Sequence, residues 1–139
     1  MMPFCADCAE YHSDDLGCAP RSASALASKP LCIYVAGPLS GDVAANVRRA
    51  MEAGITLMRR GHHPMVPHLT QFLDDLVTSG GGEPIPYERW MALDFAWLER
   101  ADAILHLAPS PGADRELAFA EERGLRVFRS VEDVPEVGL

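Results

Sequence analysis

The amino-acid sequence predicts an α/β fold in which a parallel β-sheet carries helices on both of its faces. Short apolar runs alternate with longer segments whose apolar residues recur at helical spacing, and this alternation is typical of parallel sheets. The chain has 139 residues, 48% of them hydrophobic and 23% charged, which suits one domain with one core. Since no apolar run approaches the roughly 18 residues of a membrane span, we expect no membrane segment.

The first strand is predicted at residues 31–36 (Leu-Cys-Ile-Tyr-Val-Ala). A glycine-containing turn at 37–41 follows, and Asp42 can cap a helix that extends to about Arg60. Gly61 is expected to end this helix. Its apolar positions recur at helical spacing and include Val43, Val47, Met51, Ile55 and Met58.

The middle of the chain is predicted to contain a second strand and two helices. The strand covers 62–66 and is weaker than the first. A short helix covers 67–77, with Phe72, Leu73 and Leu76 on one side. A glycine-rich loop at 79–84 leads to a helix over 87–100, whose buried stripe is predicted to contain Trp90, Leu93, Trp97 and Leu98.

The last part of the chain repeats the alternation. Residues 103–107 predict a buried strand, and a helix over 113–123 ends at Gly124. A strand at 125–128 and a helical turn at 131–134 complete the chain. We therefore expect a Rossmann-like or flavodoxin-like sheet. Right-handed crossovers would bring the segments that follow the strands to one edge, where ligands bind in open α/β sheets.

The segment 110–116 (Ser-Pro-Gly-Ala-Asp-Arg-Glu) is the most informative about function. It brings the hydroxyl of Ser110, the backbone of Gly112 and the carboxylate of Glu116 to the place where a strand gives way to a helix. Acids are favoured in the first turn of a helix by its dipole, so Glu116 alone does not indicate catalysis. Asp114 is a candidate for the local helix cap.

A second carboxylate, Asp94, lies in the middle of a predicted helix. It shares a helix face with Trp90 and Leu98, so we expect it to point inward. A buried carboxylate needs partners or has a raised pKa. Two carboxylates that converge from separate elements suit glycosidic chemistry, in which one attacks the anomeric carbon and the other assists the leaving group.

The turn formed by Gly37, Ser40 and Gly41 lies between a strand and a helix, where free N–H groups can hold a phosphate or a sugar. A capped turn without a ligand is the alternative. The Gly-x-Gly-x-x-Gly fingerprint is absent, so we do not expect a dinucleotide. Tyr34 is either a core aromatic residue or a phenol that reaches the pocket from the end of its strand.

The histidines fall into two groups. His68 and His106 follow or end predicted strands, so either could line the pocket, although a histidine in such a place is more often a structural hydrogen-bonding group. His62 and His63 are predicted to lie at the surface.

Together these residues resemble the nucleoside 2-deoxyribosyltransferase superfamily, including its nucleotide N-glycosidase branch, and most closely the DUF4406-like group. The resemblance covers roughly residues 31–128. The matching motifs are Tyr34-Val-Ala-Gly-Pro-Leu-Ser-Gly41, Asn46, Asp94 with Ala101-Asp-Ala103, and Ser110-Pro-Gly-Ala-Asp-Arg-Glu116. Within the last motif, Asp114 and Arg115 stand where the transferases usually have a short hydrophobic or glycine-rich segment.

The resemblance implies a role for each matching residue. Glu116 would attack C1′ of a nucleoside or nucleotide and form a glycosyl-enzyme intermediate, Asp94 would protonate or orient the base, and Tyr34 would hold the nucleophile. Ser110 would contact a 5′-phosphate, as in the hydrolase branch. The remaining residues expected to line this site are Gly37, Ser40, Gly41, His68 and Gly112. The resemblance implies a homodimer and no cofactor for catalysis.

The sequence therefore predicts an enzyme that hydrolyses or exchanges the N-glycosidic bond of nucleosides or nucleoside 5′-monophosphates. The alternative is a non-catalytic nucleotide-binding module on the same fold, with an N-terminal segment that docks a partner. A net charge of −8, from 12 Lys+Arg against 20 Asp+Glu, argues against nucleic acid as a partner. Residues 1–18 lack the basic start and apolar core of a signal peptide, so we expect a cytoplasmic location.

Residues 1–29 differ in composition from the main domain, which we place at 30–139. Residues 19–29 are small and polar and indicate a linker. Before them, Cys5, Cys8, His12 and Cys18 are ligand types for a structural zinc ion at close spacing; a disordered tail with scattered thiols is the alternative. Cys32 is expected to be a small buried side chain within its strand.

Overall fold

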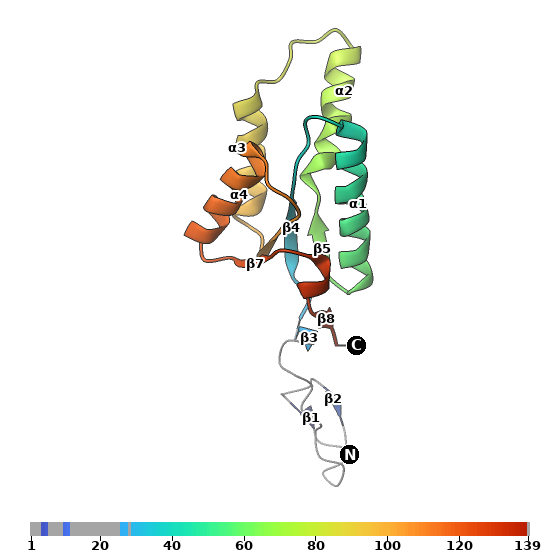
Figure 1. The fold of residues 1–139 in the computed structure, drawn as a ribbon, viewed down its shortest axis with the longest axis vertical. Coiled ribbons are helices and arrows are strands. Elements are labelled where there is room, and N and C mark those ends of the chain that lie inside the picture. The colour runs from blue at the N-terminus through green and yellow to red at the C-terminus, as the bar shows by residue number, and fades with distance from the viewer. Residues whose placement is uncertain (1–3, 6–9, 12–25, 28, 139) are drawn as a thin grey trace.

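The computed structural model describes residues 4–5, 10–11, 26–27 and 29–138. Among them, a four-stranded parallel sheet with helices on both faces confirms the predicted fold class (Figure 1). The strands of this sheet lie in the order β5-β4-β6-β7. Their bounds are Cys32–Ala36 for β4, His63–Met65 for β5, Ala103–His106 for β6 and Arg126–Phe128 for β7.

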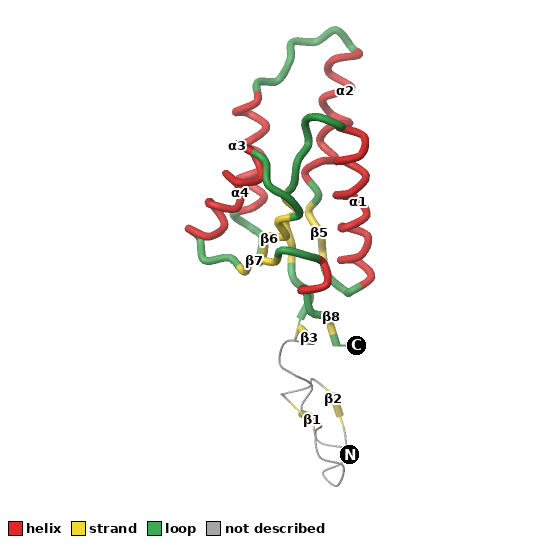
Figure 2. Tube along the Cα trace, in the orientation of Figure 1, coloured by secondary structure: helices red, strands yellow, loops and turns green. Residues whose placement is uncertain are grey.

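The strand order creates a point where the winding of the chain reverses. The chain passes from β4 outward to β5, then returns across β4 to β6 and continues to β7. The loops after β4 and β6 leave the same end of the sheet, and they are drawn in green above the yellow strands in Figure 2. In open α/β sheets, ligands bind at such a switch point outside the carboxyl ends of the strands.

The helices cover the two faces of the sheet unequally. Helix α1 (Val43–Arg59) packs on the face that contains Ile33 and Val35. Helices α3 (Tyr87–Leu98) and α4 (Pro111–Glu122) pack on the opposite face, which contains Tyr34 and Ala36. All four of these β4 side chains are fully buried, as the alternation of side chains along a strand between two helical layers requires.

Helix α1 begins and ends as predicted, but its buried face is formed by small residues. The Asp42 side chain accepts a hydrogen bond from the backbone N–H of Ala45 (3.1 Å), and Gly61 (φ +91°) follows the last turn. The buried positions are Ala50, Ala53, Gly54 and Leu57. Of the larger apolar residues that set the predicted periodicity, Met51, Ile55 and Met58 are exposed.

The segment after β5 contains two short helical elements where one was predicted. A 3₁₀-helix, η2 (Pro67–Thr70), leads directly into α2 (Gln71–Ser79). The apolar side chains predicted on one side of this segment, Phe72, Leu73 and Leu76, are all exposed. In α3, Met91 and Leu98 are buried, whereas Trp90, Leu93 and Trp97 are half-buried.

The start of α4 corrects the prediction by two residues. The helix begins at Pro111, and its cap is Ser110 instead of Asp114: the Ser110 hydroxyl oxygen accepts a hydrogen bond from the backbone N–H of Ala113 (3.1 Å). Proline suits the first position of a helix because that position needs no backbone donor. The helix ends before Gly124 (φ +72°), as expected.

His62 is buried, and its predicted surface position is wrong. Its Nδ1 accepts a hydrogen bond from the backbone N–H of Leu31 (3.0 Å), so its Nε2 carries the proton and donates to the carbonyl oxygen of Pro135 (2.6 Å). This imidazole joins the start of the sheet to the C-terminal segment. His63 is exposed, as predicted.

A separate two-stranded sheet joins residues that precede β4 to the C-terminal segment. Strand β3 (Leu26–Ala27) pairs in parallel with β8 (Glu136–Val137), so part of the predicted linker is a strand. The predicted final helical turn is the 3₁₀-helix η3 (Val131–Asp133). Short strands of this kind depend on their partner and leave little periodic pattern in the sequence.

The predicted zinc segment is only partly described. Strand β1 (Phe4–Cys5) pairs antiparallel with β2 (Glu10–Tyr11). Cys8, His12 and Cys18 lie outside the described residues, so the zinc site stays a prediction. Cys32 is a free, half-buried cysteine. None of the helices in the described ranges is both long and apolar enough to cross a membrane.

Candidate functional site

A cavity of about 560 Å³ lies at the switch point of the sheet. Its volume falls in the range of small-molecule sites in proteins. The loop after β4, the start of α4, the segment η2–α2 and helix α3 all contribute to its wall. The lining residues are Gly37, Leu39, Ser40, Val43, Pro67, His68, Thr70, Gln71, Asp74, Tyr87, Trp90, Met91, Asp94, Ser110, Pro111, Gly112, Ala113 and Glu116.

The structure brings most of the predicted site residues to this one cavity. They come from four separate stretches of sequence: Gly37, Ser40, His68, Asp94, Ser110, Gly112 and Glu116. Two predicted residues do not line it. Tyr34 is fully buried within β4, and Gly41 (φ +95°) shapes the turn that leads into α1.

Glu116 is the buried carboxylate of this cavity. Because α4 begins at Pro111, Glu116 lies beyond the first helical turn. A favourable interaction with the helix dipole therefore does not explain the presence of an acid at this position. Only 6% of the residue is exposed, and its Oε2 has no hydrogen-bond partner in the described part of the chain. Burial, aided by the nearby charge of Asp94, raises the pKa of Glu116 to about 8.

Asp94 enters the same cavity from α3, as its predicted inward orientation requires. Its Oδ1 is buried and also lacks a hydrogen-bond partner among the described residues. Burial raises the pKa of Asp94 to about 7. Two carboxyl groups from different helices therefore share one electrostatic environment, and their titrations are coupled.

The phenol of Tyr34 is close to this pair but does not line the cavity. Burial raises the pKa of Tyr34 far above its ordinary value, and the charges of Glu116 and Asp94 raise it further. The phenol favours the ionised form of Glu116 and so lowers the pKa of that carboxyl, in opposition to burial. The two groups are close but are not aligned as a formed hydrogen bond, since both Tyr34 Oη and Glu116 Oε2 are unpaired.

The loop after β4 is held by two side chains from its neighbours. His68 Nε2 lies 3.1 Å from the carbonyl oxygens of both Gly37 and Pro38, so it carries a proton and donates to them. Burial lowers the pKa of His68, which keeps the ring neutral. Asn46 Nδ2 donates to the carbonyl oxygens of Leu39 (3.2 Å) and Ser40 (3.0 Å). These contacts give His68 and Asn46 a structural role in shaping the cavity.

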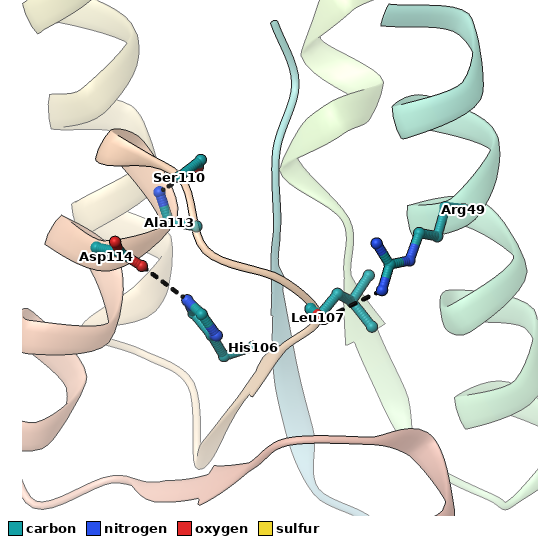
Figure 3. A network of polar contacts seen from close by, with 6 residues as sticks. All are labelled: Arg49, His106, Leu107, Ser110, Ala113 and Asp114. Carbon is teal, nitrogen blue, oxygen red and sulfur yellow. Dashed lines mark hydrogen bonds and ion pairs between the residues drawn. The ribbon is translucent and has the colours of Figure 1, made fainter. Parts of the chain in front are cut away.

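Asp114 and Arg115 point away from the cavity. The Nε2 of His106, a buried residue of β6, donates to Asp114 Oδ1 at 3.1 Å (Figure 3). Arg115 forms two hydrogen bonds with the carboxylate of Glu88, at 2.9 and 3.2 Å. Their side chains therefore connect α4 to β6 and α3 without occupying the cavity that Ser110 and Glu116 line.

Several wall residues had no signal in the sequence analysis. Asp74, Gln71 and Thr70 come from the segment η2–α2, on the side away from its exposed apolar residues. Tyr87 of α3 packs against Gly112 of α4. A Cβ on Gly112 would lie 3.3 Å from Tyr87 Oη, so glycine permits this close approach. For Asp74, the one sequence signal that could have indicated a place in the cavity wall is the polar face of the predicted helix over 67–77.

A protein-family model described as "Domain of unknown function (DUF7768)" matches residues 31–130. No curated protein matches the chain. The matched region contains the whole four-stranded sheet and all residues that line the cavity. Because the match covers well over half of the 139 residues, the chain belongs to the DUF7768 family.

Proposed function

We propose that this protein cleaves the N-glycosidic bond of nucleosides or nucleoside 5′-monophosphates, by hydrolysis or by transfer of the sugar to another base. The observation that carries the proposal is the pairing of Glu116 with Asp94: both line one ligand-sized cavity, and each has a buried, unpaired oxygen. Carboxyl pairs from separate elements are the usual catalysts of glycosidic chemistry. The resemblance to the nucleoside 2-deoxyribosyltransferase superfamily supports the same reaction. We place the reaction in the cytoplasm.

The proposed reaction has two steps. In the first, a Glu116 carboxylate oxygen bonds to C1′ of the sugar while the C1′–N bond breaks, and Asp94 delivers its proton to the departing base. In the second, water or an acceptor base attacks C1′, the bond to Glu116 breaks, and Asp94 takes the proton of the attacking group. Tyr34 does not line the cavity, so it acts as a positioning residue for Glu116.

The proposal is tested by incubating the protein with a panel of nucleosides and their 5′-monophosphates and measuring free base by chromatography. Each substrate is incubated once alone and once with a second base as acceptor. Release without an acceptor indicates hydrolysis, and a new nucleoside indicates transfer. If no substrate yields either product, the proposed function is wrong.

The pH dependence follows from the carboxyl pair. The reaction needs Glu116 ionised and Asp94 protonated, a state in which the pair holds one proton. With pKa values of about 7 for Asp94 and about 8 for Glu116, the single proton lies mainly on Glu116, and the reactive form with the proton on Asp94 is the minor form of this state. The amounts of both forms are greatest between those two values. We therefore expect kcat/KM for base release to form a narrow bell with its maximum between about pH 7 and 8. A maximum below pH 5 would show that burial does not raise these pKa values.

We also propose that the chain forms a homodimer. Large apolar side chains on the outer faces of α1 and α2 remain exposed in the single chain, and Phe72 (64%) and Leu76 (70%) are the most prominent on α2. Further exposed apolar residues are Met51, Ile55 and Met58 of α1, Leu73 of α2 and Leu69 of the adjoining η2. Large apolar patches on a protein surface usually mark an interface, and we propose that these side chains form one. α2 also supplies part of the cavity wall, so an interface there would lie beside the site.

The dimer is tested by measuring molar mass with light scattering during size-exclusion chromatography. The parent protein should have about twice the 15.1 kDa mass of one chain. Leu76→Glu should reduce this to the mass of one chain, because a charge would be buried in the interface. Thr78→Glu adds the same charge at another exposed position of α2 and should leave the mass unchanged. A parent protein with the mass of one chain would overturn the proposal.

A further inference from the structure

The cavity walls carry an uneven set of charges. Three carboxyl groups line the cavity, those of Asp74, Asp94 and Glu116. Among the described residues, no lysine or arginine lines it. His68 adds no positive charge, because burial lowers its pKa and its Nε2 already donates to backbone carbonyls. The cavity wall therefore carries acidic side chains and no lysine or arginine, and it becomes more negative as the Glu116–Asp94 pair ionises.

The two helix N-termini at the cavity do not replace the missing cations. At α1, the carboxylate of Asp42 occupies the positive end of the helix and accepts from Ala45 N–H. At α4, Pro111 has no N–H and the N–H of Ala113 donates to Ser110. Among the first three residues of α4, Gly112 is thus the one whose backbone N–H is free. Phosphate sites at helix starts depend on several free N–H groups, which neither helix offers here.

Two arginines, one on α1 and one on α4, bind groups outside the cavity lining. Arg49 donates to the carbonyl oxygen of Leu107 at 3.1 Å, as Figure 3 shows. Arg115 is held by Glu88. A dianionic phosphate in this cavity would therefore face carboxylates without a cation to neutralise it, and such repulsion is strong where water is excluded.

Given the proposed N-glycosidic function, on which this step rests, we infer that the cavity accepts nucleosides and discriminates against their 5′-monophosphates, with Asp74 as the discriminating residue. Asp74 is half-buried in the cavity wall, and none of the ion pairs between described residues includes it. Its carboxylate can accept a hydrogen bond from a sugar hydroxyl or a base N–H, but it repels a phosphate at the same distance. Thr70 and Gln71 extend this polar wall with neutral groups.

The test compares the common 2′-deoxynucleosides with their 5′-monophosphates in two measurements on the full chain. Calorimetry gives the Kd of each ligand for Glu116→Gln, which cannot form the proposed covalent intermediate. Base release gives kcat/KM for the parent protein. We expect each nucleoside to bind at least about tenfold more tightly than its monophosphate, a difference of about 1.4 kcal/mol, and kcat/KM to follow the same order.

Two neighbouring variants test the role of Asp74. Asp74→Asn should strengthen monophosphate binding by about three- to tenfold relative to the nucleoside, because it removes one negative charge from the wall. Asp75→Asn makes the same change at the adjacent exposed residue, which does not line the cavity, and should leave the ratio unchanged. An unaltered ratio in Asp74→Asn would overturn the role of this residue.

The outcomes separate this inference from the proposed function. If monophosphates bind as tightly as nucleosides or release base faster, the inference is wrong, and N-glycosidic cleavage stands provided that the parent protein releases base from either class. If nucleosides bind selectively but no base is released, the selectivity stands and the proposed function fails. If neither ligand class binds, both are overturned.

Discussion

Glu116→Gln is expected to lower the rate of base release by about 10⁴-fold or more, since removal of a covalent nucleophile has effects of this size. The amide is nearly the same size as the carboxyl, so the shape of the cavity and the contacts of α4 are retained. Its oxygen is too weak a nucleophile to bond to C1′. The measurement is kcat/KM for the best substrate of the panel.

The control is Glu122→Gln, which makes the same change at an exposed residue of the same helix and should retain full activity. A second variant, Glu116→Ala, leaves room for a small anion beside C1′. Azide should then restore release of the base and yield a glycosyl azide, because the anion forms the bond that the carboxylate no longer can. Undiminished release by Glu116→Ala without azide would show that another group attacks the sugar.

Glu116→Gln is also expected to stabilise the folded protein at alkaline pH. Below about pH 4 the Glu116 carboxyl is protonated in both the folded and the unfolded chain, so it does not affect their balance. Between its ordinary value of 4.5 and its folded pKa of about 8, only the unfolded chain ionises. The folded state then loses about 1.4 kcal/mol of stability per pH unit. Above about pH 8 the loss is complete.

Glu116→Gln removes this loss. We expect its free energy of unfolding, relative to that of the parent, to rise by roughly 4 kcal/mol from pH 4 to pH 8, because the cost of burying the amide is the same at both pH values. Urea denaturation at pH 4, 6 and 8 measures the difference. Glu122→Gln should show no pH-dependent difference, because that side chain is exposed. If Glu116→Gln is less stable than the parent at pH 8, the buried carboxylate makes favourable contacts that the structure does not contain.

The expected loss of activity and the expected gain of alkaline stability both follow from the buried carboxyl group of Glu116. A carboxyl group with an unpaired buried oxygen is costly to the fold, so its presence requires an explanation beyond packing. Active-site groups commonly destabilise the proteins that contain them. A variant that loses activity and gains alkaline stability together would connect that cost to catalysis.

Much of the fold could be predicted because strand and helix periods differ. The apolar runs at β4 and β6 and the caps of α1 are local signals, and the structure agrees with them. The buried face of α1 could not be predicted in the same way. Its small residues, including Ala50 and Gly54, let the helix lie close to its neighbours: a Cβ on Gly54 would come within 2.8 Å of Val66. Side-chain hydrophobicity alone favoured the wrong face.

The candidate site was predictable where it depends on strand ends. Gly37, Ser110 and Glu116 follow parallel strands, so the topology alone brings them to one edge. Asp74 and Tyr87 reach the cavity because α2 and α3 pack beside that edge, and no local pattern encodes this packing. The start of α4 was misplaced because Ser110 and Asp114 are both capping residue types. The proline at 111 was the deciding signal.

The most direct test of the central claim is to locate the sugar on the protein during turnover. The parent protein is mixed with its best substrate and quenched rapidly in acid, and the intact mass and the peptide masses are measured. We predict a mass increase of one sugar residue on the peptide that contains Glu116, and none in Glu116→Gln. Attachment of the sugar to Asp94 or to any other residue would contradict the assignment of Glu116 as the nucleophile.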